Sequence, residues 1–566
     1  MSAAEAAAVA AALAPDEEQF QTNADLANTD SALVRNSLTG SAWTLVSRVT
    51  GLARVVAIGA VLGATFLGNT YQGIYALPSL VYYQLLAGSL FISLLVPSLV
   101  THIRNGDRAR ADEFVRGFLG SLLALASIAV CIVLVASPLI LHLFSLGVSN
   151  EAIAADQRRV GLLLLVLFTP QILLYVIAGT GAAVMNAFGR FGLASAAPTA
   201  ENLGIILTLL ISAAVFGTSV GISTVTTSEV LLLGIGTTAA VLLHAALQWF
   251  GARRSQISMY ASAGWRDPEV RALLGRIKAV LTYTGLEALL LLATIVVANR
   301  IAGGLVAFQL ALNFFYLPAA IITWPVTRAL VPRLAAFHQT KRMGAFRDEF
   351  SQAVGLVSFA SIPIAVAYGL SASVIAEIIA FGRLDGEPGT TYVAVSILAL
   401  SPAVITHAWF TLGSYALYSQ QNVSVPLRGM VVRVVTTLLL MIPAVLTEGA
   451  SSLALIGLAI AGGTLIGAVY VSRRVTRGLP RTDFSVARSL GRTALASVVM
   501  LVPAACAWIA LSGLPESKLG DVVRLVVAGS LGALAFLAVQ AWLKAPELRM
   551  IRGGVGRVIP ARHEGS

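Results

Sequence analysis

The chain has 566 residues, of which 57% are apolar and only 11% are charged. A soluble globular protein carries about 25% charged residues, so this chain lacks the polar surface that would keep it in water. The mean hydropathy of +0.84 agrees, and the composition predicts an all-α protein that crosses a membrane many times. Six His and two Cys leave little material for a metal centre, and we expect neither a metal nor an enzymatic activity.

Residues 1–34 differ from the rest of the chain. They are rich in alanine, contain six acidic side chains and have no aromatic cluster. No basic segment followed by an apolar core is present, so this stretch is not typical of a secretory signal. We expect a disordered cytoplasmic tail.

Long apolar runs follow. A helix needs about 20 mostly apolar residues to cross the hydrocarbon core of a bilayer. About fourteen runs of this length occur, at 42–65, 72–100, 115–143, 159–186, 193–216, 229–250, 279–299, 304–332, 351–379, 391–417, 429–446, 452–472, 493–512 and 522–543.

Basic residues test this count, because Arg and Lys collect in short cytoplasmic loops. They gather in alternate loops, around residues 104–116, 253–278, 333–347 and 473–492, and again in the basic tail 546–566. The alternation predicts that both termini are cytoplasmic. It also explains the net charge of +11 as a topological bias, so we expect no nucleic-acid partner.

Two distant segments are alike. Each has Leu-Pro, then Leu-Val-Pro, a basic loop, and Asp-Glu-Phe, and the two copies are offset by about 235 residues. This offset covers six helices, so both copies have the same orientation. The repeat predicts two six-helix lobes with a substrate site between them. We expect the lobes at 35–255 and 256–475, and two further helices in 476–545.

Ionisable residues inside membrane spans are costly and mark functional positions. Arg48 and Arg54 lie in the first span, and a guanidinium is a forked, permanently charged donor suited to phosphate oxygens. For Arg48, the alternative is a side chain that extends to the lipid headgroups. Glu287 lies in the seventh span, and Arg328 near the end of the eighth is its candidate partner.

Four more side chains enter the prediction. Tyr82 and Tyr83 in the second span offer a surface for a sugar, although packing is the alternative. His244 and His407 each lie alone in an apolar context, which favours buried, hydrogen-bonded histidines over ligands.

Several collinear motifs resemble the MurJ/MviN lipid II flippases of the multidrug/oligosaccharidyl-lipid/polysaccharide exporter superfamily. The motifs are 47–54 (SRVTGLAR), 62–64 (LGA), 77–79 (LPS), 185–191 (MNAFGRF), 381–383 (FGR) and 418–422 (YSQQN). The resemblance extends from about residue 40 to residue 545. It implies a monomeric flippase of a bacterial cytoplasmic membrane that moves lipid II, or a related polyprenyl-diphosphate-linked glycan, by alternating access. It also implies no bound cofactor, a drive from H⁺, Na⁺ or the membrane potential, and cell-wall synthesis proteins as partners.

Some charged positions of the family pattern are changed here. Asn69 stands at a family Asp, Tyr82 and Tyr83 at an Arg pair, and Asn313 at an Arg, whereas Glu287 and Arg328 stand where the family is uncharged. The candidate cargo-binding residues are therefore Arg48, Arg54, Asn69, Tyr82, Tyr83, Glu287, Asn313 and Arg328.

Two alternative functions stay open at this point. The first is a cation or drug antiporter that exchanges its substrate for H⁺ or Na⁺ through Glu287. The second is a membrane scaffold that recruits cell-wall enzymes through its basic loops.

Overall fold

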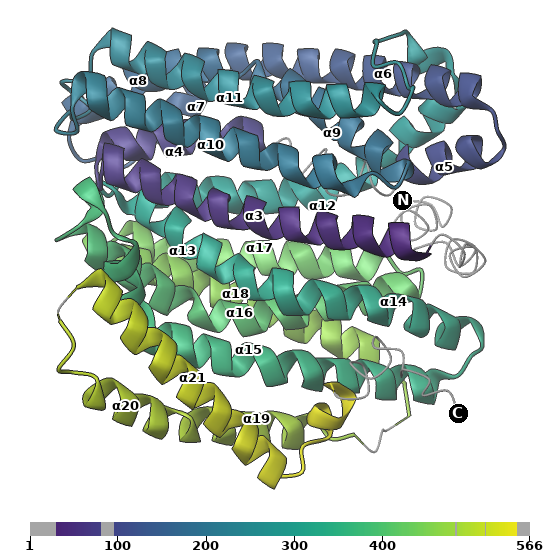
Figure 1. Cartoon of the computed structure of the whole chain (residues 1–566), viewed down its shortest axis with the longest axis vertical. Helices are drawn as coiled ribbons and strands as arrows, with labels where there is room; N and C mark the ends of the chain where they lie inside the picture. Colours follow the sequence, from purple (N-terminus) through teal and green to yellow (C-terminus); the bar gives the residue numbers. More distant parts are fainter. Residues whose placement is uncertain (1–29, 81–94, 481–483, 516, 552–566) are drawn as a thin grey trace. The chain divides into compact units, whose positions relative to one another are not determined.

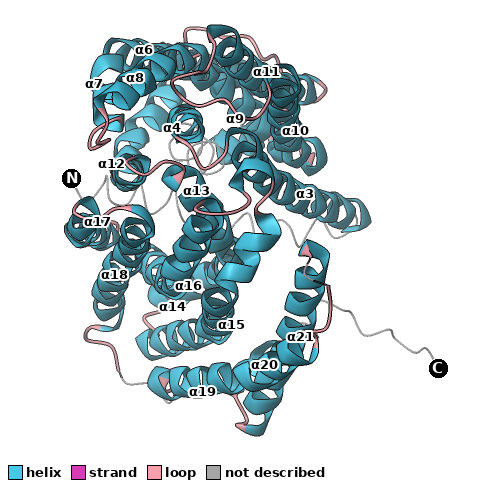
Figure 2. Cartoon of the chain, turned by 90° about the vertical axis from the view of Figure 1, so that its left-hand side faces the viewer, coloured by secondary structure: helices cyan, strands magenta, loops and turns pink. Residues whose placement is uncertain are grey.

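The computed structural model describes residues 30–80, 95–480, 484–515 and 517–551. In this part of the chain every regular element is a helix (Figure 2). Thirteen helical segments of the described residues are long and apolar enough to cross a membrane, and each coincides with a predicted span. The protein is therefore a multi-pass membrane protein. The other predicted span, 72–100, contains residues 81–94, which lie outside the described residues, so the count of fourteen is not confirmed.

The helices are labelled in chain order in Figure 1. They are α3 (Asp30–Leu62), α4 (Phe66–Leu80), α5 (Val96–Arg104), α6 (Arg108–Val135), α7 (Ser137–Phe144), α8 (Glu151–Phe168), α9 (Gln171–Ala187), α10 (Phe191–Phe216), α11 (Thr227–Arg253), α12 (Pro268–Asn299), α13 (Gly304–Pro318), α14 (Trp324–Gln339), α15 (Met343–Ile379), α16 (Gly389–Ser419), α17 (Ser424–Val445), α18 (Gly449–Thr476), α19 (Val486–Val499), α20 (Leu501–Ala510) and α21 (Lys518–Trp542). A π-helical turn, Ala319–Thr323, follows Pro318 between α13 and α14.

Helix formation in these segments has a direct physical cause. A backbone inside lipid must satisfy its own N–H and C=O groups, and an apolar run does so as a helix. Polar residues then mark where some of these helices begin. Asp107 accepts from the Arg110 N–H at 2.9 Å at the start of α6, and Asn150 accepts from the Ala152 N–H at 3.0 Å at the start of α8, as N-caps do.

The chain divides into two compact units. Unit 1 contains Met1–Leu310, Ala380–Tyr392 and Met441–Ile456, and unit 2 contains Ala311–Ile379, Val393–Leu440 and Gly457–Ser566. The lobes expected from the sequence, 35–255 and 256–475, remain a prediction.

Unit 1 is built around helix α10. It packs along α3 on one side and along α11 on the other, and α11 in turn packs against α9 (Figure 1). Small residues allow the close approach of α3 and α10: a Cβ on Gly40 would lie 2.8 Å from the Phe191 Cβ. The apolar core beside these helices contains the buried side chains of Tyr71, Phe168 and Leu209.

In unit 2, α19 and α21 pack on α15, and α20 packs on α21 (Figure 2). Their core contains Phe359 of α15 and Phe536 of α21, whose ring centres are 5.1 Å apart. The Arg524 guanidinium is neutralised within this unit by Asp521 at 3.0 Å.

The predicted repeat is visible in the turns between helices. Between α5 and α6, Gly106 has a φ of 73°, and between α14 and α15, Lys341 has a φ of 56°. Both turns have the same hydrogen bonds, with Asp107 N–H donating to His102 O and Arg342 N–H donating to Phe337 O. This pairing is typical of a helix that ends in a left-handed residue.

The other turns extend this correspondence. Positive-φ residues recur in the same order in the two halves, as the pairs Gly63 and Gly303, Gly106 and Lys341, Gly147 and Gly382, Gly189 and Gln421, and Gly217 and Gly449. All five pairs are separated by about 235 residues, the offset that the sequence motifs predict. The two halves therefore end their helices in the same way.

Gly303 is the position where this turn geometry is most restrictive. Its φ is 74°, and a Cβ placed on it would lie 2.2 Å from the Ala64 Cα. We expect Gly303→Ala to lower the free energy of unfolding by about 2–4 kcal/mol, because left-handed strain and a backbone clash add. Thermal unfolding of the purified chain in detergent measures the effect.

A matched control is available at Gly106, whose φ is 73° but whose added Cβ would meet nothing within 4 Å. Gly106→Ala should cost only the strain of about 1–2 kcal/mol. Equal losses in the two variants would show that the contact with Ala64 is unimportant.

Candidate functional site

A buried ionic cluster lies where α3, α4, α9, α10 and α11 of unit 1 meet. Glu201 of α10 is its centre and is 2% exposed. Glu201 Oε1 accepts hydrogen bonds from the Tyr75 hydroxyl at 2.8 Å and the Tyr175 hydroxyl at 2.9 Å. Its Oε2 lies 2.6 Å from His244 Nδ1, and its Oε1 lies 4.0 Å from Arg54 Nη1. Five helices thus supply one carboxylate and its partners.

The cost of burial explains why so many groups converge on Glu201. A carboxylate taken out of water needs a counter-charge and hydrogen-bond donors at its lone pairs. Arg54 supplies the charge, and Tyr75, Tyr175 and His244 supply donors. Removing one partner from such a buried arrangement costs about 3–5 kcal/mol, because the remaining charge is left uncompensated.

Arg54 is the member of the cluster that reaches its edge. Its side chain is 17% exposed, against 2% for that of Glu201 and 0% for that of His244. Its Nη1 donates to the Tyr75 hydroxyl at 2.6 Å, and the guanidinium carbon lies 4.9 Å from the centre of the Tyr75 ring. The tyrosine therefore fixes the direction of the guanidinium.

Arg48 lies on the same helix in different surroundings. It is exposed, and it is about 9 Å before Arg54 along the axis of α3, at 1.5 Å per residue. Asn202 of α10 donates to the Ser47 carbonyl and to the Thr50 hydroxyl, both at 3.2 Å. These bonds attach the segment around Arg48 to α10 next to Glu201.

Asn69, which the sequence predicts as a cargo contact, is hydrogen-bonded to backbone groups of unit 1, and the contact with cargo stays a prediction. It is 0% exposed, and its Nδ2 donates to the Ile301 carbonyl at 2.7 Å. Its Oδ1 accepts from the N–H groups of Leu305 at 3.1 Å and Val306 at 3.4 Å. These N–H groups lie in the first turn of α13, which has no intrahelical partner for them, so Asn69 acts as an N-cap from a distant helix.

Asn69 belongs to a second buried cluster, which consists of amide side chains and also contains Asn299 and Gln157. Asn299 Nδ2 donates to the Phe144 carbonyl at 2.7 Å, and Gln157 Nε2 donates to Asn299 Oδ1 at 3.1 Å. Asn299 and Gln157 are both 0% exposed. The cluster therefore joins α4, α7, α8 and α12 within unit 1.

The remaining predicted residues are distributed over both units. Glu287 is half-buried on α12 in unit 1, whereas half-buried Asn313 on α13 and exposed Arg328 on α14 belong to unit 2. A pairing of Glu287 with Arg328 stays a prediction. Tyr82 and Tyr83 lie outside the described residues.

Of the two lone histidines, His244 is the buried, hydrogen-bonded residue that the sequence predicts. His407 packs its ring against Phe315, with ring centres 5.4 Å apart, but its buried Nδ1 has no hydrogen-bond partner among the described residues. The expectation of a hydrogen-bonded His407 is therefore wrong at this nitrogen.

The sequence analysis missed Glu201, Tyr75 and Tyr175. Glu201 had a usable signal, because it is an acid inside the apolar run 193–216 and the argument applied to Glu287 applies equally to it. Tyr75 and Tyr175 had no such signal in the sequence. Their partner is 126 and 26 positions away, and only helix packing brings them to it.

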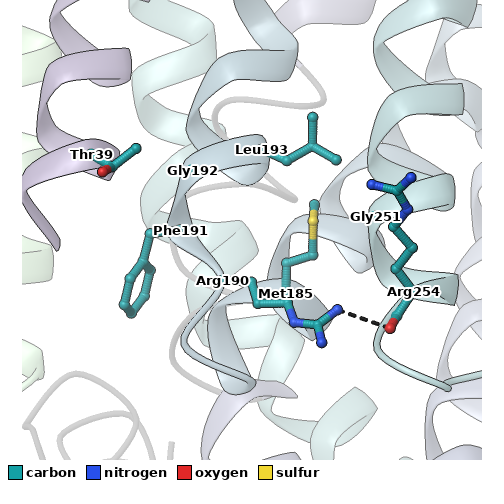
Figure 3. Close-up of a pocket in the computed structure, with 8 residues that line it drawn as sticks. All are labelled: Thr39, Met185, Arg190, Phe191, Gly192, Leu193, Gly251 and Arg254. Carbon is teal, nitrogen blue, oxygen red and sulfur yellow. Dashed lines mark hydrogen bonds between the residues drawn. The ribbon is translucent and has the colours of Figure 1, made fainter. Parts of the chain in front are cut away.

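A cavity of about 290 Å³ lies beside the turn between α9 and α10 (Figure 3). It is lined by Thr39, Met185, Arg190, Phe191, Gly192, Leu193, Gly251 and Arg254. Arg190 Nη1 donates to the Arg254 carbonyl at 2.8 Å. This hydrogen bond joins the turn between α9 and α10 to the end of α11. The segment is the one that resembles the family at 185–191.

Another family-like segment, 381–383, has a structural arginine. Arg383 Nη1 donates to the Val220 carbonyl at 2.8 Å and lies 3.5 Å from the Leu62 carbonyl at the end of α3. Arg300 is similar, since its Nη1 donates to the Val445 carbonyl at the end of α17 at 2.5 Å. Arg383 thus joins the end of α3 to the loop after α10, and Arg300 satisfies a carbonyl that the end of α17 leaves without an intrahelical partner.

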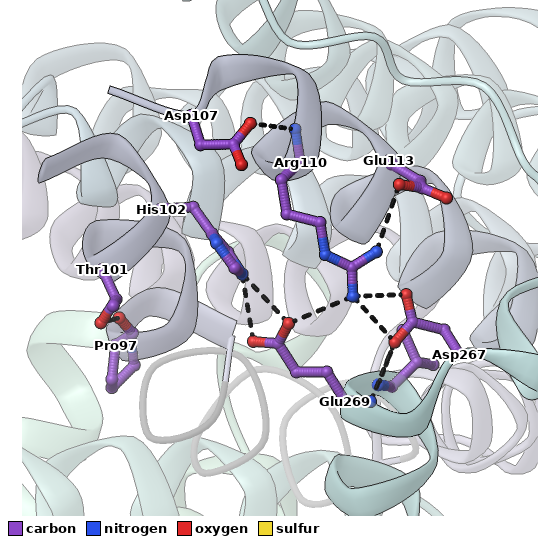
Figure 4. Close-up of polar contacts among 9 residues, drawn as sticks. Pro97, Thr101, His102, Asp107, Arg110, Glu113, Asp267 and Glu269 are labelled. Atoms are coloured by element: carbon purple, nitrogen blue, oxygen red, sulfur yellow. Dashed lines mark hydrogen bonds and ion pairs between the residues drawn. The ribbon is translucent and has the colours of Figure 1, made fainter. Parts of the chain in front are cut away.

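A second ionic network joins the start of α6 to the start of α12 (Figure 4). Arg110 Nη2 lies 2.8 Å from Asp267 and 3.5 Å from Glu269, and Glu269 also lies 3.0 Å from His102 Nε2. The guanidinium therefore separates two carboxylates that would otherwise repel each other.

We expect Arg110→Ala to lower the free energy of unfolding by about 1–2 kcal/mol, because Asp267 and Glu269 lose their shared counter-charge. Salt should reduce this loss. The matched control is Arg116→Ala, since Arg116 is 44% exposed and lies 4.0 Å from Asp112, and it should cost less than about 1 kcal/mol. Thermal unfolding at low and high salt compares them, and equal effects would contradict the expectation.

Comparisons with known proteins agree with the fold. A family model, "Lipid II flippase MurJ", matches residues 58–527. "Probable lipid II flippase MurJ" of Haemophilus influenzae is 24% identical over 78% of this chain and 85% of that protein. The protein of the same name from Rhizobium tropici is 24% identical over 94% of this chain and 98% of its own length.

Solved structures show the same architecture. "Lipid II flippase MurJ, inward closed conformation" has a TM-score of 0.68 at 16% identity and covers 89% of this chain and 98% of its own. A MATE family transporter of the MOP superfamily in an inward-facing conformation has a TM-score of 0.59 at 15% identity and covers 78% of this chain and 98% of its own. Because the family model matches most of the chain, the protein belongs to the MurJ lipid II flippase family.

Proposed function

We propose that this chain is a flippase of the bacterial cytoplasmic membrane that moves lipid II from the inner to the outer leaflet. Membership of the MurJ family and the thirteen membrane-spanning segments among the described residues support this function. Within it, the cluster around Arg54 is the feature that the cargo chemistry requires.

The supporting observation is a guanidinium kept charged inside a membrane span. Lipid II carries a diphosphate, which loses its hydration when it leaves the headgroup region and needs cations in exchange. Arg54 is partly exposed and lies 4.0 Å from Glu201 Oε1, so a phosphate oxygen can compete for it. A guanidinium binds two phosphate oxygens with parallel hydrogen bonds, which an isolated ammonium cannot do.

Arg48 is the second proposed contact with the cargo. It precedes Arg54 on α3 and is exposed, and a diphosphate with two anionic groups can bridge two such cations. The polyprenyl tail would stay in the bilayer, since burying it in protein gains nothing over lipid. Only the headgroup would then pass along α3.

Reconstitution tests the function directly. The full chain is placed in vesicles that contain lipid II in one leaflet, and the fraction that reaches the other leaflet is measured over time. We expect transfer that depends on the chain and is absent with empty vesicles. In cells, depletion of the chain should leave lipid II on the cytoplasmic side.

Two outcomes would overturn the proposal. Vesicles that export an organic cation in exchange for H⁺ but do not move lipid II would support the antiporter alternative, with Glu287→Gln as its diagnostic variant. Growth rescue by variants that cannot transport lipid II would support the scaffold alternative.

A further inference from the structure

We propose that His244 and Glu201 form a proton-binding site, and that one H⁺ is taken up when Arg54 leaves Glu201 to bind the diphosphate of the cargo. This inference rests on the proposed function, because it needs an anionic ligand for Arg54. It assigns to the cluster a second ligand, a proton, besides the cargo.

The protonation state of the resting cluster follows from its hydrogen bonds. An ionised carboxylate only accepts, so His244 Nδ1, 2.6 Å from Glu201 Oε2, carries a hydrogen. The two tyrosine hydroxyls donate to the other carboxylate oxygen. With Arg54 as the cation and His244 neutral, the cluster has no net charge, which is the arrangement that burial favours.

The second nitrogen of His244 is where a proton can be added. His244 Nε2 lies 3.5 Å from Gln248 Nε2, and the ring is 0% exposed. Gln248 Nε2 donates to the Ala194 carbonyl at 2.9 Å, whereas the buried Gln248 Oε1 has no hydrogen-bond partner among the described residues.

This glutamine provides a suitable acceptor. Rotation of its amide exchanges the oxygen and nitrogen, so that Gln248 Oε1 faces His244 Nε2 and the hydrogen bond to the Ala194 carbonyl is given up. The exchange replaces a hydrogen bond between neutral groups by one from a charged N–H, which is the stronger of the two. An Nε2–H formed by protonation would donate to that oxygen. The imidazolium would therefore have both N–H groups satisfied, one by Glu201 and one by Gln248.

Charge balance connects the proton to the cargo. When the guanidinium of Arg54 moves to a phosphate, Glu201 remains in a buried position without its cation, and an uncompensated buried charge costs several kcal/mol. A proton from water on His244 Nε2 restores a neutral pair, with the imidazolium in place of the guanidinium. When the cargo leaves and Arg54 returns, the proton goes back to water.

Among the described residues, the titratable side chains in contact with Glu201 are Arg54, Tyr75, Tyr175 and His244. The helices packed on α10 contribute Arg54 from α3, Tyr175 from α9 and His244 from α11, and α4 contributes Tyr75. Glu201 is the one titratable residue in the sequence of α10 itself. The tyrosine hydroxyls already donate to Glu201, whereas His244 has a second ring nitrogen that can take up a proton.

Linkage makes the proposal measurable. The two affinities are coupled: the factor by which protonation strengthens cargo binding equals the factor by which cargo binding strengthens proton binding. The dissociation constant for lipid II should then rise about tenfold per pH unit across the range in which the cargo-bound site is protonated and the free site is not.

The experiment is calorimetric titration of the purified full chain with lipid II in buffers that differ in ionisation enthalpy, which counts protons per lipid bound. We expect uptake of about one proton in the wild type near neutral pH. Glu201→Gln and His244→Gln should bind lipid II with little or no uptake. Two variants are used because either one alone can fold poorly.

The matched control is Glu229→Gln on α11. Glu229 is also buried and accepts from Ser212 at 3.3 Å, but it lies outside the cluster, so proton uptake should be unchanged. Wild-type binding with no uptake and no pH dependence would refute the proton site and leave the flippase function intact. Failure of the wild type to bind or move lipid II at any pH would refute the proposed function instead.

Discussion

Replacement of Arg54 by alanine is expected to reduce lipid II transfer in vesicles by about 100-fold, because one charge-assisted contact with a phosphate contributes about 3 kcal/mol. Growth of cells that depend on the chain should fail. His244, Tyr75 and Tyr175 still contact Glu201 in this variant, and the amount of protein in the membrane is measured beside transport.

The loss of Arg54 also removes the cation of Glu201, so stability must be separated from transport. The double variant Arg54→Ala and Glu201→Gln removes the orphaned charge and should restore stability without restoring transport. Arg158→Ala is the matched arginine control, because Arg158 pairs with Glu151 at the start of α8 and contacts no member of the cluster. Full transport by Arg54→Ala would refute the proposed role.

Replacement of Asn69 by leucine is expected to lower the free energy of unfolding by about 2–4 kcal/mol. The leucine leaves the buried N–H groups of Leu305 and Val306 without their acceptor, which combines the loss of an N-cap with unsatisfied backbone groups. Thermal unfolding in detergent measures the effect, with binding of lipid II as a second readout.

The control for Asn69 is Asn105→Leu in the exposed turn before α6, which should change stability by less than about 0.5 kcal/mol. If Asn69 instead contacts the cargo, Asn69→Leu would weaken lipid II binding and leave the unfolding temperature unchanged. That result would confirm the prediction made from the sequence.

These two residues show how far sequence reasoning extends. Both were selected from the sequence as cargo contacts. Arg54 was selected because it is a cation in an apolar span, and it lies in an ionic cluster, where such charges are stable. Asn69 was selected because it stands at a charged family position, but its partners lie more than 230 positions away. No local pattern reports such a contact.

Glu201 is the opposite case. The sequence contains the signal for it, an acid in a membrane span. Its donors Tyr75 and Tyr175 look like ordinary aromatic residues of apolar helices. Only their arrangement around one carboxylate distinguishes them from packing residues.

The sequence by itself determined thirteen of the spans, the helical class and the repeated motifs. These are local properties, because lipid forces an apolar run of about 20 residues into a helix. The positive-φ turns came from the structure, since Lys341 and Gln421 adopt them without the glycine that would signal them. The tertiary structure alone decided which polar residues meet. Each helix must rotate and slide until its few buried polar groups find partners, and that choice depends on all the neighbouring helices at once.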